Sequence, residues 1–213
     1  MICYKHVMRL AVAALDHLVL ATADLDETAA WVADRTGIVP SPGGRHVGRG
    51  TRNMLCSLGA TRYLEIIGPD PEQNDVDGPR PFGIDALDDA RMVSWAVSVI
   101  DIDAAVESSR EQGFDPGEVF AMQRQRPDGV LLSWRLTVSD SITTPFLIDW
   151  LDSPHPAPDA APGLELAELR ARHPDPSSLS LRLEALGLVM GVAYGPEALL
   201  VELRGPAGAI VFD

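Results

Sequence analysis

The pattern of apolar and polar positions along this chain repeats three times. In each copy, a short apolar run that fits a strand leads into a mixed polar and apolar segment that fits a helix. The copies occupy residues 15–37, 93–113 and 166–187. Self-similarity of this kind predicts an architecture built from repeated units.

The ends of the three predicted helices follow from local chemistry. An aspartate stands where each helix starts, and its carboxylate accepts hydrogen bonds from the free N–H groups of the first turn. A glycine stands where each helix ends, because glycine adopts positive φ without strain. These residues are Asp24, Asp101 and Asp175 at the starts and Gly37, Gly113 and Gly187 at the ends.

Apolar runs separated by turn residues follow each helix and predict strands. The predicted strands lie at 45–48, 53–58 and 62–67, then at 118–123, 130–138 and 145–151, and finally at 189–193, 199–204 and 210–212. Residues 127–129, with the sequence Pro-Asp-Gly, form a clear hairpin turn. Each unit is therefore predicted to be βαβββ, and the third is a reduced copy.

Two connectors separate the predicted units. Residues 68–90 are rich in proline, glycine and acidic residues, and residues 153–163 (SPHPAPDAAPG) predict a semi-rigid, extended spacer. The chain is thereby divided into a first module at 11–70, a second at 91–152 and a reduced third at 164–213.

Composition and charge narrow the class of protein. The 213 residues are 46% apolar and 23% charged, as is typical of a soluble globular protein. The formal net charge of −14 argues against nucleic acid and anionic membranes as main partners, since both need a basic face. No apolar stretch approaches the roughly 20 residues that cross a bilayer.

The cysteines and the amino terminus suggest a compartment. Cys3 and Cys56 allow one disulfide at most, and two cysteines in a chain of this size are more typical of reduced thiols in the cytosol. The apolar run at 10–15 is short and continues into the first strand, so it does not fit a removable secretory signal. We therefore expect a cytoplasmic protein.

Two polar residues stand in strands where they are costly. His17 lies in LDHLVLA and Glu65 in YLEII, both apolar on either side. A buried imidazole needs a partner, and a buried carboxylate needs a counter-charge or a metal ion even more strongly. Their occurrence in the same module suggests a joint role.

At this point the sequence resembles the vicinal oxygen chelate superfamily, which includes glyoxalases, extradiol dioxygenases and antibiotic-resistance proteins, and most closely its glyoxalase-like domain proteins. The resemblance covers nearly the whole chain. It rests on LDHLVL at 15–20, GGRHVGRGTRNMLCSLG at 43–59, YLEIIGPDP at 63–71 and PFLIDW at 145–150.

The resemblance implies an α+β fold in which tandem βαβββ modules form a half-open mixed β-barrel with the helices outside. It also implies metal ligands on the first and fourth strands of each module, which are His17 and Glu65 in the first. The equivalent positions of the second module fall at Ser94 or Trp95 and at Asp149 or Ile148, so the family's second histidine is missing.

His46 offers a substitute ligand. If it points into the same cavity, His17, His46 and Glu65 make a two-histidine, one-carboxylate set that suits a divalent metal such as Zn, Fe, Mn or Ni. The alternative is that the two histidines bond to ordinary backbone or side-chain partners and Glu65 pairs with an arginine. The spacing does not decide between these interpretations.

A local basic cluster runs against the acidic composition. Residues 43–53 hold three arginines, four glycines and two short polar residues, and we predict that Arg45, Arg49, Thr51 and Asn53 bind an anionic small molecule. Arg124 and Arg126 lie in the comparable region of the second module. The alternative for all these arginines is pairing with surface acids.

Trp95 and Asp149 complete the predicted substrate-binding residues. We expect Trp95 to lie near the predicted ligand positions as an aromatic wall of the cavity. Asp149 stands beside Trp150 at a strand end, and the alternative for this acid is that it faces solvent. No GxGxxG, phosphate loop, nucleophile elbow or CxxC occurs, so nucleotide cofactors and serine or cysteine nucleophiles lack support.

Two functions remain open from the sequence. The first is a metal-dependent lyase, isomerase or dioxygenase in which Glu65 and His46 act on a metal-chelated substrate. The second is a metal-free protein that binds or sequesters a small molecule. We further expect an intrachain barrel in a monomer or homodimer, with the third module completing a sheet or covering the barrel mouth.

Overall fold

The structure is a computed structural model that describes residues 14–73 and 78–213. Cys3 and most of the apolar run at 10–15 lie outside the described residues. The other cysteine, Cys56, is a free, buried thiol in the core, as predicted. No helix within the described ranges is long and apolar enough to span a membrane.

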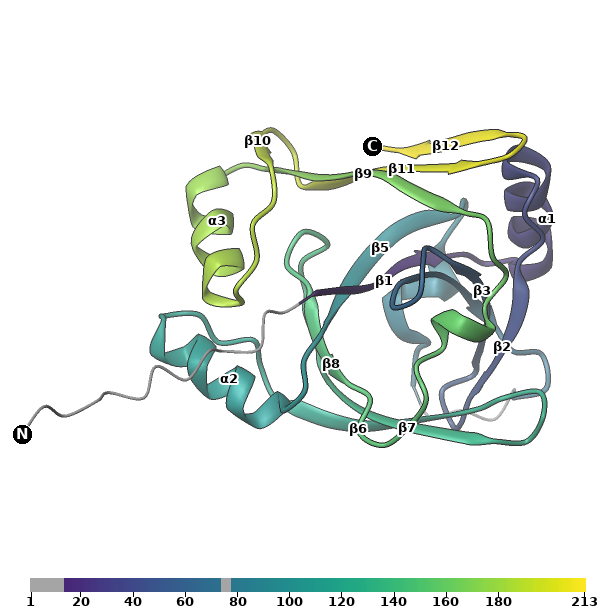
Figure 1. The fold of residues 1–213 in the computed structure, drawn as a ribbon, viewed down its shortest axis with the longest axis horizontal. Helices are drawn as coiled ribbons and strands as arrows, with labels where there is room; N and C mark the ends of the chain where they lie inside the picture. The colour runs from purple at the N-terminus through teal and green to yellow at the C-terminus, as the bar shows by residue number, and fades with distance from the viewer. Residues whose placement is uncertain (1–13, 74–77) are drawn as a thin grey trace, which may run out of the picture.

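Eight strands form a barrel, and three α-helices lie outside it (Figure 1). Along the described residues the first module comprises β1 Ala14–Ala21, α1 Leu25–Thr36, β2 Ser41–His46, β3 Thr51–Ser57 and β4 Tyr63–Pro69. The second comprises β5 Arg91–Ser98, α2 Ile102–Glu111, β6 Val119–Gln125, β7 Leu131–Thr137 and β8 Phe146–Asp149. Short 3-10 segments lie at Pro81–Ala86 and Ala157–Asp159.

The two modules are related by equivalent strand pairings. In each, the first strand pairs in parallel with the fourth, as β1 with β4 and β5 with β8. The modules join through the antiparallel pairs β1–β5 and β2–β6, so the sheet closes on itself in the order β1-β4-β3-β2-β6-β7-β8-β5. The predicted α+β class with tandem βαβββ modules is confirmed, and the barrel is more closed than the half-open form that we expected.

The helix signals act as the sequence suggested. In all three helices the side chain of the predicted N-cap aspartate accepts a hydrogen bond from a backbone N–H of the first turn: Asp24 from Glu27, Asp101 from Ala104 and Asp175 from Ser178. Gly37 ends α1 in the left-handed conformation at φ 77°. The local aspartate and glycine signals were therefore sufficient to place these helix ends.

β2 differs most from its prediction, because it spans Ser41–His46 rather than 45–48 and includes two of the glycines that we expected to approach a ligand. These glycines let β2 approach its neighbours closely. A Cβ atom on Gly44 would lie 2.1 Å from the carbonyl oxygen of Gln125 on β6, and one on Gly43 would lie 2.2 Å from the side chain of Asn53. The glycine-rich segment thus forms part of the junction between the two modules.

The third unit has the expected order of elements but not the pairing of the first two. It comprises β9 Glu165–His173, α3 Pro176–Ala185, β10 Val192–Tyr194, β11 Ala198–Gly205 and β12 Gly208–Phe212. These strands form a separate sheet in the order β10-β9-β11-β12, in which β9 pairs in parallel with the strand that follows its helix rather than with the last one. The unit is therefore not a topological copy of the barrel modules.

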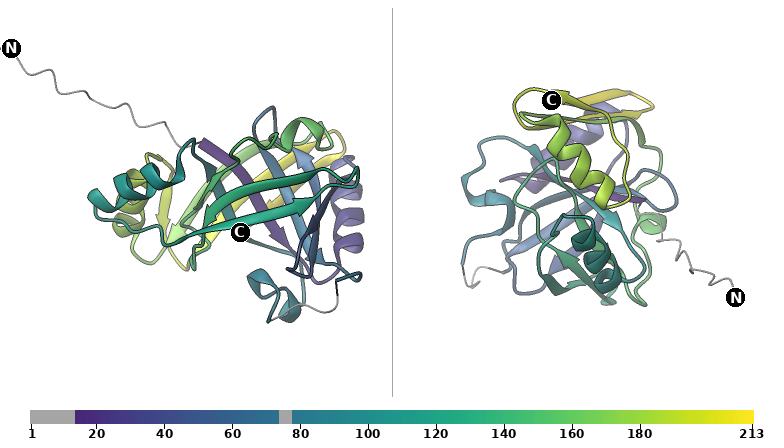
Figure 2. Two further views of the ribbon diagram at one scale, coloured as in Figure 1. Left: turned by 90° about the horizontal axis from the view of Figure 1, so that it is seen from below. Right: turned by 90° about the vertical axis from the view of Figure 1, so that its left-hand side faces the viewer.

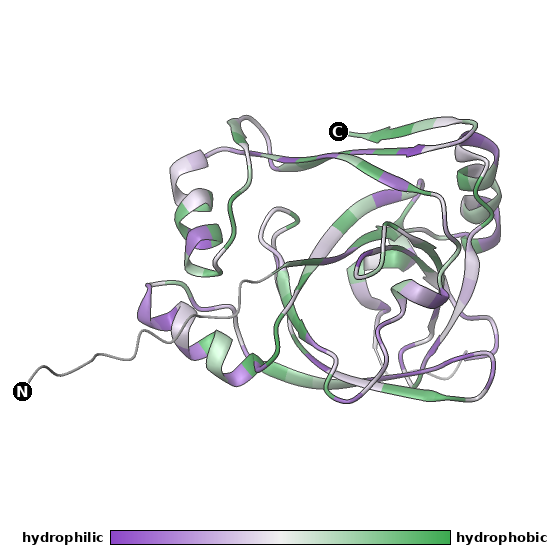
Figure 3. Cartoon of the chain, in the orientation of Figure 1, coloured by the Kyte–Doolittle hydropathy of each residue, from purple (hydrophilic) through white to green (hydrophobic). Residues whose placement is uncertain are grey.

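This C-terminal sheet packs along one side of the barrel, next to α1 (Figures 1 and 2). Leu18 and Leu64 on the outer faces of β1 and β4 share a core with Leu179 of α3 and Leu203 of β11. A second apolar cluster, which includes Val19 and Ile148, fills part of the barrel interior. β1 is coloured as strongly apolar in Figure 3, as a strand with apolar residues on both faces should be.

The connectors pack on the barrel rather than only spanning between units. In the segment predicted to be a spacer, Ala157 and Ala160 form a small core with Leu55 and Tyr63, and Ala161 bonds to the backbone of β3. The other connector places Pro79, Pro81 and Phe82 against the barrel cavity. Both segments therefore contribute to the surroundings of the barrel interior.

Candidate functional site

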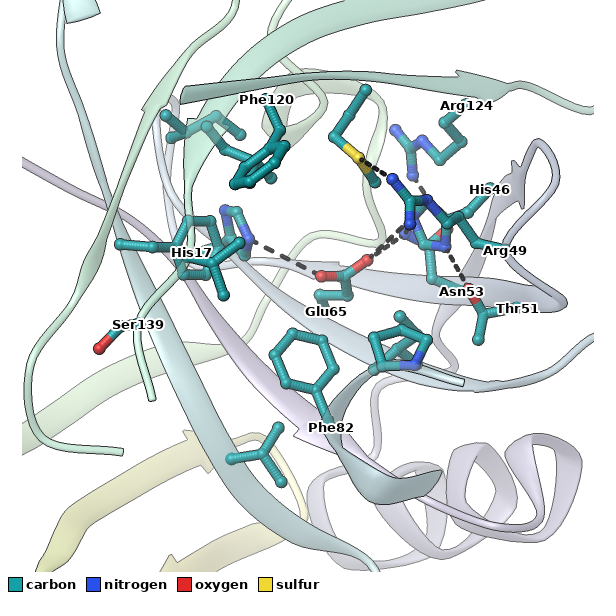
Figure 4. A pocket seen from close by; sticks show the side chains of 18 of the residues that line it. His17, His46, Arg49, Thr51, Asn53, Glu65, Phe82, Phe120, Arg124 and Ser139 are labelled. Atoms are coloured by element: carbon teal, nitrogen blue, oxygen red, sulfur yellow. Dashed lines mark hydrogen bonds and ion pairs between the residues drawn. The ribbon is translucent and has the colours of Figure 1, made fainter. Parts of the chain in front are cut away.

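The barrel encloses a cavity of about 860 Å³ whose lining is shown in Figure 4. Alternation along the strands turns one set of polar side chains inward, and these come from different strands. The buried polar set is His17 on β1, His46 on β2, Thr51 and Asn53 on β3, Glu65 on β4 and Arg124 on β6. Five of these six residues belong to the first module.

Glu65 lies between two imidazoles. Its Oε2 atom is 3.7 Å from Nε2 of His17, and its Oε1 atom is 3.5 Å from Nε2 of His46. Figure 4 shows both rings directed toward the carboxylate. The three residues that the sequence suggested as a set are thus brought together inside the barrel.

The charge state of Glu65 follows from these neighbours. Burial is the largest single influence and raises the pKa of the carboxyl group. The hydrogen bonding and charge of His46, the charge of His17 and the amide of Asn53 together outweigh it and lower the pKa from 4.5 to about 2. Glu65 is therefore an ionised group that accepts hydrogen bonds at neutral pH.

His17 is held from behind by Asp16, a residue that sequence reasoning did not single out. Nδ1 of His17 lies 2.7 Å from Oδ1 of the fully buried Asp16, while Oδ2 accepts hydrogen bonds from the indole of Trp150 at 3.0 Å and from Nε2 of His155 at 3.1 Å. His155 carries its proton on Nε2, because its Nδ1 accepts the N–H of Ala157.

This network fixes the tautomer of His17. Burial raises the pKa of Asp16, but the hydrogen bonds and charges of His155 and His17 outweigh it and lower the pKa to about 2. An ionised Asp16 only accepts hydrogen bonds, so Nδ1 of His17 carries the proton. The Nε2 atom of His17 is thereby left facing the cavity and Glu65.

His46 and Asn53 are also held by neighbours. Nδ1 of His46 lies 3.0 Å from the hydroxyl of Thr51. The amide nitrogen of Asn53 donates to Oε1 of Glu65 at 2.5 Å and lies 3.4 Å from Nε2 of His46. Arg124 donates to the amide oxygen of Asn53 at 2.9 Å, which fixes the orientation of the amide.

Arg124 is a buried cation without an acidic partner among the described residues. Arg124 is 3% exposed and, within the described part of the chain, its guanidinium donates only to the neutral Asn53, while Nε has no hydrogen bond. Pairing with a surface acid was the alternative that the sequence left open for Arg124, and the buried position of this residue differs from it. The signal that places it inside is the alternation of Phe120, Met122 and Arg124 along β6.

The opposite wall of the cavity comes from the second module and is apolar. Phe146 and Ile148 on β8 and Trp134 on β7 line it. Ile148, rather than Asp149, is the inward residue of the β8 pair considered as a ligand, and Ser94 is buried without lining the cavity. The second module thus supplies no counterpart to His17 and Glu65.

Several residues that we predicted to bind substrate lie elsewhere. Arg45 points outward and pairs with Asp70 and Glu72. Trp95 faces the outer core of the barrel, where its indole donates to the carbonyl of Thr143, and Asp149 accepts the backbone N–H groups of Ile102 and Leu151. A shift of one residue along a strand reverses the side that a side chain faces, which explains both of the second-module misplacements.

Arg49, Thr51 and Asn53 do line the cavity. Arg49 lies at its mouth, with its guanidinium 3.5 Å from the sulfur of Met122 and no acidic partner within the described ranges. The third unit contributes Glu197 to the same mouth, where it accepts a hydrogen bond from the hydroxyl of Thr143 at 2.8 Å.

The donor chemistry of His17, His46 and Glu65 suits a divalent ion, but their arrangement does not. The amide of Asn53 already contacts both the carboxylate oxygen and the imidazole nitrogen that would face an ion. In residues 14–73 and 78–213, no three histidine, cysteine or acidic side chains are gathered closely enough to hold a metal. An ion would first have to displace the Asn53 amide, so the arrangement of these three residues does not fit a bound metal ion.

Two βαβββ modules thus close around a cavity that holds a buried cluster of histidines, Asn53 and Glu65. The family model of the glyoxalase-like domain matches residues 15–187, and the chain belongs to this family. The predicted resemblance to the vicinal oxygen chelate superfamily is thereby confirmed. No curated protein matches the sequence significantly.

Solved structures match this chain at low sequence identity, and the first of those that follow shares its fold. A hypothetical protein from Staphylococcus aureus has a TM-score of 0.62 and 16% identity, over 94% of this chain and 85% of that chain. A methylmalonyl-CoA epimerase from Mycobacterium tuberculosis has a TM-score of 0.46 and 19% identity, over 70% and 95%. A methylmalonyl-CoA epimerase in complex with methylmalonyl-CoA and ammonium has a TM-score of 0.41 and 19% identity, over 68% and 100%.

Proposed function

We propose that this glyoxalase-like protein binds a small, oxygen-rich anion in its barrel cavity and exchanges protons with it through His17 and His46. The observation that carries the proposal is the buried guanidinium of Arg124 beside the Glu65–histidine cluster. Of the residues expected to act on substrate, Glu65 takes an orienting and charge-balancing role in this proposal, and His46 keeps an acid–base role.

The anion is inferred from the cost of an unpaired charge. A buried cation is strongly unfavourable unless an opposite charge or several acceptors compensate it. Arg124 has one neutral acceptor in the described residues, and Arg49 at the mouth has only a sulfur contact. A carboxylate on the ligand would pair with the Arg124 guanidinium and supply the missing negative charge.

The proton-transfer role is inferred from the two imidazoles. A carboxylate with a pKa of about 2 is a weak base, so Glu65 is better suited to stabilising a positive charge than to removing a proton. Nε2 of His17 faces the cavity beside the ionised Glu65, and Nε2 of His46 becomes accessible there once a ligand displaces the Asn53 amide. This arrangement supports acid–base chemistry next to a ligand carbonyl or hydroxyl group.

Calorimetric titration with matched carboxylates and their neutral amides tests the anion. We expect carboxylates to bind the natural protein more tightly than the amides, and Arg124→Gln to remove the difference. Arg126→Gln is the matched control, because Arg126 lies two residues further along and pairs with Asp128 and Asp159 at the surface. Equal binding of acids and amides by the natural protein would contradict the proposal.

A protein that only binds its ligand is the second candidate, and the apolar wall of the second module favours it. Exchange of the benzylic hydrogens of phenylpyruvate in D₂O, followed by proton NMR, separates the two. We expect exchange above the uncatalysed rate, reduced in His46→Gln. Tight binding with no acceleration of exchange would leave binding alone as the function.

Elemental analysis tests whether the protein binds a divalent metal ion. Protein purified without added chelator should contain clearly less than one equivalent of any divalent ion, because the Asn53 amide already contacts Oε1 of Glu65 and Nε2 of His46. A full equivalent of metal that disappears in His17→Ala and Glu65→Ala would show that the metal-dependent hypothesis was correct.

A further inference from the structure

The two walls of the cavity have different chemistry. The first module contributes histidines, Asn53 and Glu65, whereas the inward residues of β7 and β8 are aromatic or aliphatic. Because the modules are equivalent in topology, this difference arises from the side chains alone. A ligand that fills the cavity must therefore match a polar wall on one side and an apolar wall on the other.

The aromatic side chains touch the polar cluster directly. The rings of Phe146 and His17 pack edge to face with their centroids 5.4 Å apart. The rings of Trp134 and His46 pack in the same way with their centroids 6.3 Å apart. The ring centroid of Trp150 lies 5.2 Å from that of Trp134, so Trp150 extends the same wall of the cavity. A ligand whose polar group reaches the imidazoles would therefore have its next atoms against aromatic rings.

The size of the cavity and the residues at its mouth also indicate a large ligand with an apolar part. A volume of about 860 Å³ lies near the upper end of the range typical of sites for drug-sized molecules and far exceeds what a two- or three-carbon acid needs. Phe82 and Phe120 line the cavity yet are 38% and 43% exposed, so apolar surface remains uncovered there. Phe82 also has a positive φ of 60°, an uncommon conformation for a bulky residue.

From these contacts we infer the class of ligand: a carboxylate attached to a bulky, flat, apolar body, whose charged end meets Arg124 and whose ring system lies against Phe120, Trp134 and Phe146. This inference rests on the proposed anion site and adds the nature of the rest of the molecule. Burial of the ring would cover the aromatic surface at the mouth, which favours binding in proportion to the area removed from water.

Binding of a graded set of probes tests the inference. Acetate, pyruvate, benzoate and 1-naphthoate differ in apolar area, and benzamide and 1-naphthamide are the neutral counterparts. We expect 1-naphthoate to bind at least about tenfold more tightly than acetate or pyruvate. We also expect Phe120→Ser to weaken 1-naphthoate about tenfold without changing acetate, because Phe120 lies at the exposed mouth and contacts only the ring. Leu131→Ser is the control, since Leu131 is similarly exposed on β7 but does not line the cavity.

The outcomes separate this inference from the proposed function. Equal binding of acetate and 1-naphthoate would overturn the aromatic ligand class and leave the anion site in place. Equal binding of 1-naphthoate and 1-naphthamide would overturn the anion site itself. Failure of every probe to bind would contradict both.

Discussion

The cavity side chains of this protein depend on the residues that hydrogen-bond to them, and His17 is the clearest example. His17 faces Glu65 on the cavity side and Asp16 on the other, and both acids have pKa values lowered to about 2. The ionised Asp16 accepts the Nδ1 proton of His17, so the tautomer of this histidine is defined. The cluster should therefore be sensitive to acid and to loss of either carboxylate.

Acid should destabilise the folded protein through Glu65. Its carboxyl binds a proton more weakly in the folded state than in the unfolded one, so the stabilisation is complete above about pH 5 and is lost as the pH falls toward 2. Urea unfolding at several pH values should show a shallower fall in the free energy of unfolding for Glu65→Gln, by up to about 1.4 kcal/mol per pH unit. Glu107→Gln, at an exposed site on α2, is the control. Parallel curves for the natural protein and Glu65→Gln would show that Glu65 is not a strongly acidic group.

Asp16 should control the tautomer of His17. In Asp16→Asn the acceptor for the Nδ1 proton becomes a neutral amide, so we expect nitrogen NMR to show His17 shifting from the Nδ1–H form toward a mixture. His155→Gln should produce a smaller change. His173→Gln should produce none, because among the described residues the His173 ring bonds only to the backbone of Asp175. An unchanged His17 spectrum in Asp16→Asn would contradict this role.

How far the sequence identified individual residues depended on their neighbours in the chain. His17 and Glu65 stood out because each interrupts an apolar strand. Arg124 did not, because VFAMQRQ also fits a solvent-facing strand with polar residues on both sides. The partnership of Asp16 with His155 joins residues 139 positions apart and leaves no local signal.

Secondary-structure elements were predictable where local signals decide them. The Asp N-caps and the glycine at the end of α1 act within a few residues, and all were correct. Trp95 and Asp149 were misplaced because strand register depends on which neighbour a strand pairs with. β2 starts earlier than its predicted bounds because Gly43 and Gly44 pack closely against β3 and β6, a tertiary contact that leaves no local signal.

Gly44 should be essential to the junction between β2 and β6. A methyl group there would lie 2.1 Å from the Gln125 carbonyl oxygen, at a backbone φ of 143°, so Gly44→Ala should lower the free energy of unfolding by more than about 2 kcal/mol. Gly48→Ala is the control: its φ is +70°, but no atom of the described residues lies within 4 Å of an added Cβ, so a loss of about 1 kcal/mol is expected. Denaturant unfolding measures both, and equal losses would argue against close packing at this junction.

At the scale of the whole molecule, the C-terminal sheet completes the outer core of the barrel. Leu18 and Leu64 on the barrel share that core with Leu179 and Leu203 of the third unit, and Glu197 reaches the cavity mouth. The sequence correctly suggested a third unit with the order βαβββ. It did not suggest the different strand pairing, because strand order in a sheet follows from packing against the barrel rather than from the local pattern.

Removal of the third unit should therefore destabilise the barrel. A chain ending at residue 163 would expose the apolar outer faces of β1 and β4, and we expect it to aggregate or to melt at a much lower temperature than the full chain. Glu197→Gln in the full chain is the control for the cavity mouth and should keep the melting temperature. A truncated protein that melts like the full chain would show that the third unit is dispensable for the barrel.

A crystal structure of the protein with 1-naphthoate tests the central claim most directly. We expect a carboxylate oxygen within hydrogen-bonding distance of the Arg124 guanidinium, next to His46, with the ring against Trp134 and Phe146. A naphthoate carboxylate bound at Arg45 on the surface, or turned away from Arg124 inside the barrel, would contradict it.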